Sequence, residues 1–449
     1  MSSVSVGRLL RHGACAGAVG ALVVAGLGRG VAFADDPAQS DQLWIQVPYE
    51  QTVVVAPDGG AAPYRSLALG LYHSNDNFTV TDGRLTVDVS GLTGVAEVVW
   101  PDNCTPNGTG TVAVCDTGDV PTEYTAQVQL KVRATAGAAV GAQGAIEYSA
   151  EATGGPDGTL VSAANSFKTL VTVGSGPDLG LGAPRDVTGV APGSRLTVPF
   201  SVTNTGNETA HGFSVQMWAT YGLDVVTRYP QCTYTGPDDS GPYLPVTYVT
   251  CSFDTAVAPG ATVRLPKPLR LAVTHHALYD RFDYAIEPDG GATDLDESDN
   301  SRSWRIDADN TADFAVRGAE ASGAAGDTVT TAFRFVNHGP AWAAYSSGEP
   351  IAVIDFYLPE GTTATDVPDA CFSAWTSGDD PAIGHYICGL PMWIEPGLKV
   401  RFPFRLHIDR VVPDATGHVI ARPRYGGTSF PFDPNSRNNS AEVIVNPSA

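Results

Sequence analysis

Short stretches of this chain alternate hydrophobic and polar residues, a pattern that places successive side chains on opposite faces of a β-strand. Leu196, Val198, Phe200 and Val202 form one such run, and similar runs cover residues 128–132 and 400–408. The 49 glycines and 33 prolines fall between the runs, where tight turns need their backbone conformations. No stretch beyond residue 34 has a convincing helical period. The pattern predicts an all-β chain of sandwiches.

A set of landmarks recurs in the same order at an offset of about 135 residues. The second and third copies each have an apolar strand after an aspartate, then Asn-x-Gly, two cysteines, a Pro-Gly turn and a closing Asn-Ser. In the second and third copies these are Asp178–Leu181 and Asp313–Val316, Asn204–Gly206 and Asn337–Gly339, Cys232/Cys251 and Cys371/Cys388, Pro259-Gly260 and Pro396-Gly397, and Asn300-Ser301 and Asn439-Ser440. The first copy diverges, because His73-Ser74-Asn75 stands at its Asn-x-Gly position.

The length of the repeat indicates independent domains. Solenoid repeats have periods of about 20 to 50 residues, so each longer copy should fold around its own core. We therefore predict three tandem Ig-like β-sandwich domains over residues 35–174 (the divergent copy), 177–306 and 313–449. We expect them to be joined like beads through residues 174–177 and 307–313. The Asn-x-Gly sequences suit hairpin turns, because Asn and Gly both tolerate positive φ.

The first 34 residues have the pattern of a signal peptide. Arg8 and Arg11 precede a Gly- and Ala-rich apolar run that ends near Leu27, and Ala32-Phe33-Ala34 offers small residues for cleavage. The alternative is a membrane helix, but the run is shorter than the roughly 20 apolar residues that span a bilayer. We expect cleavage after Ala34, no membrane span in the mature chain, and a protein that is secreted or held at the cell wall.

Six cysteines remain after the expected cleavage, and an exported protein meets an oxidising compartment in which thiols pair. Six cysteines allow fifteen pairings, and the repeat selects one within each copy: Cys104 with Cys115, Cys232 with Cys251, and Cys371 with Cys388. A redox or metal role would need spacing such as Cys-x-x-Cys, which the sequence lacks. We expect three structural disulfides.

The order of these landmarks resembles the Ig-like "conserved repeat" domain and is similar to the cell-adhesion-related domain of bacteria. Asn-x-Gly after a strand, Pro-x-x-Cys, a second Cys, a Pro-Gly turn, an alternating strand and a closing Asn-Asn-Ser carry this resemblance in the third copy. Both families occur in tandem in exported actinobacterial proteins. The resemblance covers nearly the whole mature chain, and it implies a secreted or surface protein with no established common ligand.

The charge balance argues against one class of partner. The chain has 26 basic and 48 acidic residues, and three of the basic residues fall in the expected leader. Such an acidic surface repels phosphate backbones, so nucleic acid is excluded as a partner. The remaining partner classes are a surface polymer or another protein.

Two neighbouring acidic runs raise the hypothesis of a calcium site. Asp294, Asp296 and Asp299 close the second copy, and Asp307, Asp309 and Asp313 follow in the joint. Calcium takes six to eight oxygen ligands, which adjacent loops could supply while stiffening the hinge. The alternative is two solvated acidic turns, since neither run matches an EF-hand loop. No other cofactor is indicated.

Two groups of aromatic residues suggest a surface for sugars: Trp342, Trp375 and Trp393 in the third copy, and Tyr229, Tyr234, Tyr243 and Tyr248 around the disulfide loop of the second. Trp375 and Tyr243 lie within the disulfide loops and are the best placed to be exposed. The alternative is that these aromatics pack in the sandwich cores. No catalytic motif occurs, so an extracellular enzyme is the third-ranked hypothesis. The sequence therefore favours a non-catalytic structural or adhesive protein, and a carbohydrate-binding protein ranks second.

Overall fold

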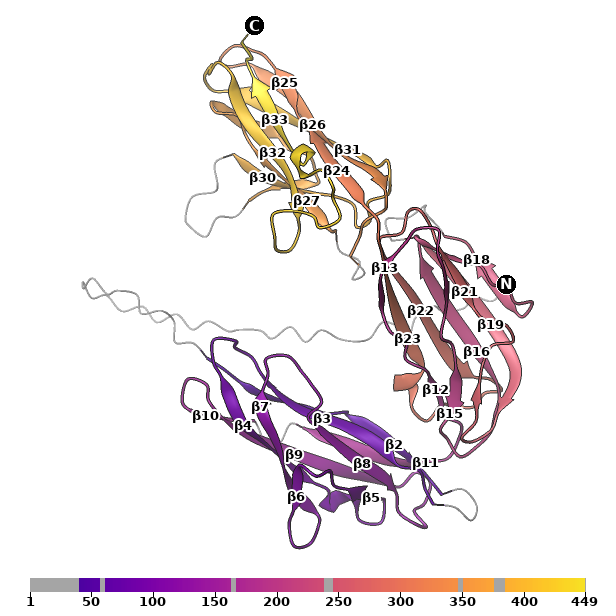
Figure 1. The fold of residues 1–449 in the computed structure, drawn as a ribbon. Helices are drawn as coiled ribbons and strands as arrows, with labels where there is room; N and C mark the ends of the chain where they lie inside the picture. The colour runs from indigo at the N-terminus through magenta and orange to yellow at the C-terminus, as the bar shows by residue number, and fades with distance from the viewer. Residues whose placement is uncertain are drawn as a thin grey trace, which may run out of the picture.

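The protein, studied as a computed structural model, is described at residues 40–56, 61–162, 167–237, 245–345, 350–374 and 384–448. Within these ranges it consists of β-strands and three one-turn 3-10 helices, Ser90–Leu92, Glu297–Asp299 and Ser436–Asn438. Figure 1 shows three sandwiches in succession, with a bend between the first and the second. The described segments contain no helix of the length and apolarity needed to cross a bilayer. The expected signal peptide lies outside the described residues.

The first sandwich combines a sheet in the order β1-β3-β8-β5 with a sheet in the order β2-β11-β9-β4-β7-β6, to which β10 is added beside β9. Side chains from both sheets form one core, as the fully buried Leu69 and Leu85 illustrate. The strands are β1 Leu43–Gln46, β2 Glu50–Val54, β3 Arg65–His73, β4 Val80–Asp88, β5 Ala96–Val99, β6 Cys104–Pro106, β7 Val112–Val120, β8 Val128–Ala134, β9 Gln143–Thr153, β10 Thr159–Val161 and β11 Lys168–Gly174.

The second sandwich has a six-stranded sheet in the order β13-β23-β22-β16-β19-β18, and its other layer is divided into β12-β15-β20 and β14-β21-β17. A second core fills the space between the layers. The strands are β12 Leu179–Leu181, β13 Val187–Val190, β14 Arg195–Thr197, β15 Val202–Asn204, β16 Ala210–Thr220, β17 Leu223–Val225, β18 Cys232–Thr235, β19 Val246–Val257, β20 Thr262–Val263, β21 Arg270–Val273, β22 Tyr279–Pro288 and β23 Ser301–Ala308.

The third sandwich packs a sheet in the order β24-β26-β31-β28 on a sheet in the order β25-β33-β32-β27-β30-β29. Its core is rich in phenylalanine, and Phe333 contacts Phe356, Phe402 and Phe404. The strands are β24 Ala312–Arg317, β25 Ala319–Ala321, β26 Thr328–Pro340, β27 Ala352–Tyr357, β28 Thr362–Asp366, β29 Cys371–Ser373, β30 His385–Gly389, β31 Lys399–Ile408, β32 Ala415–Pro423 and β33 Ser440–Val445.

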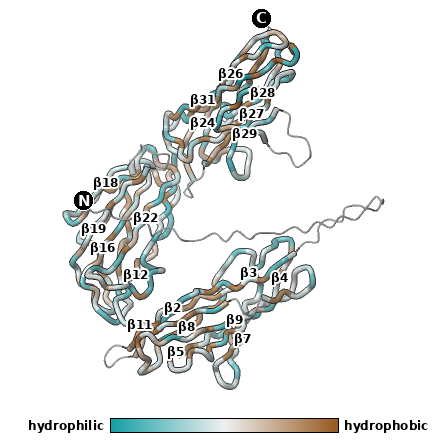
Figure 2. The backbone as a smooth tube through the Cα atoms, turned by 180° about the vertical axis from the view of Figure 1, so that it is seen from behind, coloured by the Kyte–Doolittle hydropathy of each residue, from teal (hydrophilic) through white to brown (hydrophobic). Residues whose placement is uncertain are grey.

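The strand connections identify all three sandwiches as Ig-like. In each, the first strand pairs antiparallel in one sheet, and the chain then crosses to the other sheet and pairs parallel with the last strand. The parallel pairs are β2 with β11, β13 with β23, and β25 with β33. Figure 2 shows hydrophobic positions recurring along the strands while hydrophilic ones dominate many loops. The predicted fold class, tandem Ig-like β-sandwiches, is confirmed.

The alternating run from Leu196 to Val202 is not one strand, although it was expected to be. It is split into β14 and β15, because Pro199 has no amide hydrogen to donate to a neighbouring strand. Alternation persists through the break, since Val198, Phe200 and Val202 are all buried. The corresponding strand of the third domain, β26, pairs without interruption along Thr328–Val336.

The Asn-x-Gly sequences are structural, but they are not hairpin turns. Asn204 ends β15 and the next strand, β16, lies in the opposite sheet, so the sequence begins a crossover. The fully buried Asn204 donates from Nδ2 to the carbonyls of Glu208 and Val257, and its Oδ1 accepts from the amide of Gly206 at 2.9 Å. A Cβ on Gly206 would lie 2.2 Å from the Gly176 carbonyl.

The expectation of loosely joined beads is wrong at both joints. At the first, the fully buried Asp178 and the main chain and hydroxyl of Thr205 accept hydrogen bonds from Arg65 of the first domain. At the second, β23 continues to Ala308 and β24 starts at Ala312. Only three residues separate these strands, so little free chain connects the second and third domains.

Candidate functional site

The joint between the second and third domains is built around the loop between β21 and β22. Leu278, at the end of this loop, is 2% exposed and belongs to the core of the third domain. Trp342 of the third domain donates its backbone amide to the carbonyl of His276 at 3.0 Å, and the Asn310 side chain donates to the carbonyls of His275 and Ala277. The two domains therefore hold a fixed interface.

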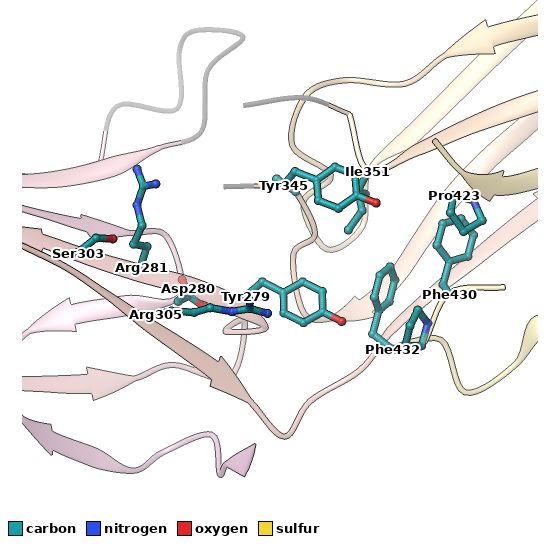
Figure 3. Close-up of a pocket in the computed structure, with 12 residues that line it drawn as sticks. Tyr279, Asp280, Arg281, Ser303, Arg305, Tyr345, Ile351, Pro423, Phe430 and Phe432 are labelled. Atoms are coloured by element: carbon teal, nitrogen blue, oxygen red, sulfur yellow. The ribbon is translucent and has the colours of Figure 1, made fainter. Parts of the chain in front are cut away.

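A cleft with a cavity volume of about 520 Å³ opens beside this interface. One wall comes from β22 and β23 of the second domain and the other from loops and strand ends of the third domain, as Figure 3 shows. Tyr279 extends between the walls, and its ring meets that of Phe432 edge-on at 6.0 Å. The lining residues are Tyr279, Asp280, Arg281, Ser303, Arg305, Ala344, Tyr345, Ile351, Pro423, Phe430, Pro431 and Phe432.

Asp280 is a structural residue at the base of this cleft. Its carboxylate accepts hydrogen bonds from the Thr220 hydroxyl at 2.6 Å, the Gly222 amide at 2.9 Å and the Leu278 amide at 3.0 Å. Burial raises the pKa of the Asp280 carboxyl to about 6, and these hydrogen bonds only partly offset that effect. With both oxygens held by the chain itself, Asp280 fixes the β21–β22 loop and has no free oxygen turned to a ligand.

The wall from the second domain continues onto the outer face of the six-stranded sheet. Along β22 the side chains of Tyr279, Arg281 and Asp283 point outward and alternate with buried Phe282 and Tyr284. The register sets one row across four strands, Ser303–Asp283–Trp218–Tyr248. We call this row and the adjoining Tyr279, Arg281 and Arg305 the outer face. Tyr248 is 47% exposed and Trp218 is half-buried.

Both arginines of the outer face are paired with carboxylates. Arg281 pairs with Asp283 and Arg305 pairs with Asp307, each through Nε at 2.8 Å. Asp186 adds a third carboxylate at the edge, where it accepts the Arg305 amide. The face thus offers hydrogen-bond donors and acceptors side by side without a net positive charge.

The three disulfides are present as predicted: Cys104–Cys115, Cys232–Cys251 and Cys371–Cys388. Each joins directly opposed residues of two neighbouring strands at a sheet edge, β6–β7, β18–β19 and β29–β30. They differ in this from the disulfide of antibody domains, which connects the two sheets. Three disulfides indicate that the protein folds in an oxidising compartment.

The predicted calcium site is not formed. Asp294, Asp296 and Asp299 lie in the β22–β23 connection near the first domain. At the other joint, Asp307 lies near the end of β23, Asp309 in the connection to β24, and Asp313 in β24. Eight residue steps of mostly extended chain, from Asp299 to Asp307 along β23, separate the two runs by roughly 25 Å. Sequence proximity was misleading because an extended strand lies between the runs. In the described parts of the chain, no group of three or more His, Cys, Asp or Glu residues could hold a metal ion.

The individual aspartates have structural partners instead. Asp294 accepts the Leu179 amide, Asp296 caps the 3-10 helix Glu297–Asp299 through Ser298, Asp307 pairs with Arg305, and Asp313 accepts from Asn438. The alternative, that both acidic runs are solvated turns, does not hold for Asp294, because this residue is only 8% exposed. Its burial and the neighbouring Asp178 raise the pKa of the Asp294 carboxyl to about 7.

Most of the aromatics suggested for sugar binding serve packing. Trp375 and Tyr243 lie outside the described residues. Trp342 and Tyr229 are buried, and Trp393 packs against Tyr221 across the joint, with ring centroids 5.6 Å apart. Only Tyr248 of the named set is exposed on a sheet face.

Sequence reasoning missed the residues that form the cleft and the outer face, namely Trp218, Tyr279, Arg281, Ser303 and Tyr345. A usable signal existed for two of them. Trp218 alternates with the buried Val215 and Met217, so it stands on the polar side of its strand, and Tyr279 does the same on β22. An aromatic residue on the polar side of a strand is a candidate for surface contacts.

Comparisons with known proteins yield only distant similarities. No protein-family model matches the chain, and no curated protein matches it. Among solved structures, Dpr2 Ig1-Ig2 in complex with DIP-Theta Ig1-Ig3 covers 91% of this chain and all of its own, at 9% identity and a TM-score of 0.25. A putative membrane anchored protein from Corynebacterium diphtheriae covers 89% of this chain and 91% of its own, at 9% identity and a TM-score of 0.19. The titin I-band fragment I67-I69 covers 91% of this chain and 99% of its own, at 8% identity and a TM-score of 0.18.

Proposed function

We propose that this chain is an exported, non-catalytic binding protein of the cell surface or extracellular space. The observation that carries the proposal is the cleft between the second and third domains, where an aromatic wall faces a polar wall across a fixed joint. Clefts between domains are preferred ligand sites, and a pre-formed site loses less entropy on binding.

The chemistry of the cleft supports binding rather than catalysis. Its carboxylate, Asp280, is occupied by three donors of the chain, and its two arginines pair with neighbouring aspartates. A general acid or base must reach the substrate with a free oxygen or nitrogen. The cleft therefore provides contact surface and hydrogen bonds, which suit recognition.

The resemblance to "conserved repeat" and cell-adhesion-related domains is part of this proposal. It suggests that the three sandwiches present the cleft at a distance from the cell, toward a wall polymer or a surface protein. The packed joints support such a role, because a stiff arm holds its binding surface in a defined position.

Cell fractionation combined with affinity capture tests this function. The purified protein should be retained by cell surfaces or wall fragments. Tyr345→Ala and Arg281→Ala, which remove one group from each wall of the cleft, should weaken retention by about tenfold. The matched control is Tyr49→Ala, which removes a ring that is 82% exposed in the first domain. Equal retention of all variants would place binding elsewhere, and no retention of the wild type would refute the proposed function.

A further inference from the structure

We propose that the ligand of this protein is a neutral, hydroxyl-rich polysaccharide that lies across the outer face of the second domain and enters the cleft at Tyr279. This inference rests on the proposed binding function and names the chemical class of the ligand. It draws on the side chains that β22, β16 and β19 present on the outer face. These side chains extend the binding surface beyond the cleft.

The aromatic residues are spaced as a platform. Trp218 and Tyr248 are direct cross-strand neighbours, so their side chains rise from the same face on adjacent strands about 5 Å apart. Tyr279 lies four residues along β22 from Asp283, the neighbour of Trp218 in the row, which places it about 13 Å further on. Sugar rings present C–H faces that pack on aromatic rings, and a series of such rings suits a chain of sugars.

The polar residues between these rings supply the complementary contacts. Arg281 and Asp283 form a half-buried ion pair between Tyr279 and Trp218, and Ser303 stands opposite Asp283 on β23. A guanidinium donates and a carboxylate accepts, so one pair can bind two neighbouring hydroxyl groups. This combination of donor and acceptor matches a sugar ring.

Charge determines which polysaccharide fits. The arginines of the outer face are each neutralised by an aspartate, and Asp186 adds another carboxylate beside them. The whole chain carries a formal net charge of −22. A polyanion would meet repulsion without an uncompensated cation to bind it, whereas a neutral glycan would not.

Another aromatic pair provides a rival location within the same protein. Trp44 and Tyr72 stack on the small sheet of the first domain, with ring centroids 6.4 Å apart, and Trp44 is 38% exposed. Its neighbours, Gln46 on the same strand and Gly70 and Tyr72 on β3, include no ion pair of the Arg281–Asp283 kind. An ion pair between strands of this sheet, Arg133 with Glu97, lies on β8 and β5, beyond β3. Trp44→Ala therefore serves as a matched control for the loss of an exposed tryptophan.

The test is binding of the purified protein to immobilised neutral polysaccharides (cellulose, β-1,3-glucan, mannan and galactan) and to two acidic ones (polygalacturonate and alginate). We expect retention on at least one neutral polymer and none on the acidic pair. Tyr248→Ala and Trp218→Ala should each weaken that binding by about tenfold or more, while Trp44→Ala and Tyr49→Ala bind as wild type. Tyr248 is exposed, so its replacement keeps the test valid if Trp218→Ala fails to fold.

Four outcomes would overturn the inference: retention by no neutral polymer, retention only by acidic polymers, wild-type binding by Tyr248→Ala, or loss of binding in Trp44→Ala. Failure here is distinguishable from failure of the proposed function. A protein retained by cell surfaces through the cleft but by no neutral polymer keeps its binding role and loses this ligand. A protein retained by neither loses both.

Discussion

Arg65, the first residue of β3 in the first domain, donates a hydrogen bond to the carboxylate of Asp178. Asp178 is fully buried and lies just before β12 of the second domain. The Thr205 hydroxyl donates to the same carboxylate at 2.6 Å. A buried charge is tolerated when it is paired and hydrogen-bonded. The buried Asp178 of the second domain is thus neutralised by a side chain of the first.

Replacing Arg65 with alanine should destabilise the second domain as well as the first joint. Removal of one partner leaves Asp178 as an uncompensated buried charge, which costs about 3 kcal/mol. We expect a lower free energy of unfolding in chemical denaturation and a wider spread of distances between the first two domains in small-angle scattering.

The double variant Arg65→Ala/Asp178→Asn separates the charge from the packing. Asparagine removes the buried charge, so the double variant should be more stable than Arg65→Ala alone, even though it lacks the same contact. A double variant that is less stable would mean that the hydrogen bonds of Asp178, and not its charge, dominate at this joint.

Asp299 makes the stability of the same joint dependent on pH. Burial, followed by the charges of Asp178 and Asp296, raises the pKa of the Asp299 carboxyl to about 6. Because the folded protein binds this proton more tightly than the unfolded chain, the free energy of unfolding falls as pH rises from about 4 to 6. In the third domain the corresponding residue is Asn438, whose Nδ2 donates to Asp313 at 2.9 Å.

Asp299→Asn should therefore stabilise the protein at pH 8, by about 1 kcal/mol once solvent screening of this half-exposed group is allowed for. The gain should shrink as pH falls toward 4, because the wild-type carboxyl is then protonated. Thermal unfolding between pH 4 and pH 8 measures both effects. Glu297→Gln, on the exposed surface of the same 3-10 helix, controls for net charge. An equal gain from both variants would assign the effect to overall charge.

The sequence predicted the fold because strand periodicity and the repeat are local signals. The alternation of hydrophobic and polar residues correctly predicted which side chains are buried, even where Pro199 divides a strand. The direction of a side chain depends on the backbone φ and ψ angles and does not require pairing with another strand. The disulfides followed from the repeat as well, and they join opposed residues in each copy. Sequence order did not reveal that Asn204 begins a crossover, because Asn-x-Gly is compatible with both a hairpin and a change of sheet.

The candidate site was beyond sequence reasoning for a different reason. Tyr279 and Tyr345 come from different domains and meet only through the joint. Conversely, Asp299 and Asp307 are eight residues apart in sequence but stand at opposite ends of β23. Contacts between domains depend on how the ends of strands from different domains meet in space, which sequence order does not show. An extended strand also holds apart residues that are only a few positions apart in the sequence.

Calcium should leave the protein unchanged. The six aspartates that the sequence suggests as ligands are divided between two joints, and at least four of them accept hydrogen bonds or pair within the chain. A ligand that does not bind the folded state cannot raise its stability. Differential scanning calorimetry with millimolar calcium and with EDTA should give melting temperatures within about 1 °C of each other. A larger rise with calcium would contradict this prediction and show that the folded protein binds the ion.

Leu278 should couple the unfolding of the second and third domains. Its backbone belongs to the second domain, but its side chain is 2% exposed in the core of the third. Leu278→Ala removes buried contacts and leaves a cavity, which typically costs about 2 to 4 kcal/mol. We expect the third domain to lose this stability and to unfold before the second in chemical denaturation followed by hydrogen exchange. Leu271→Ala, fully buried in the second core, is the matched control and should destabilise the second domain first. If Leu278→Ala lowered only the stability of the second domain, the β21–β22 loop would not be part of the third domain's core in solution.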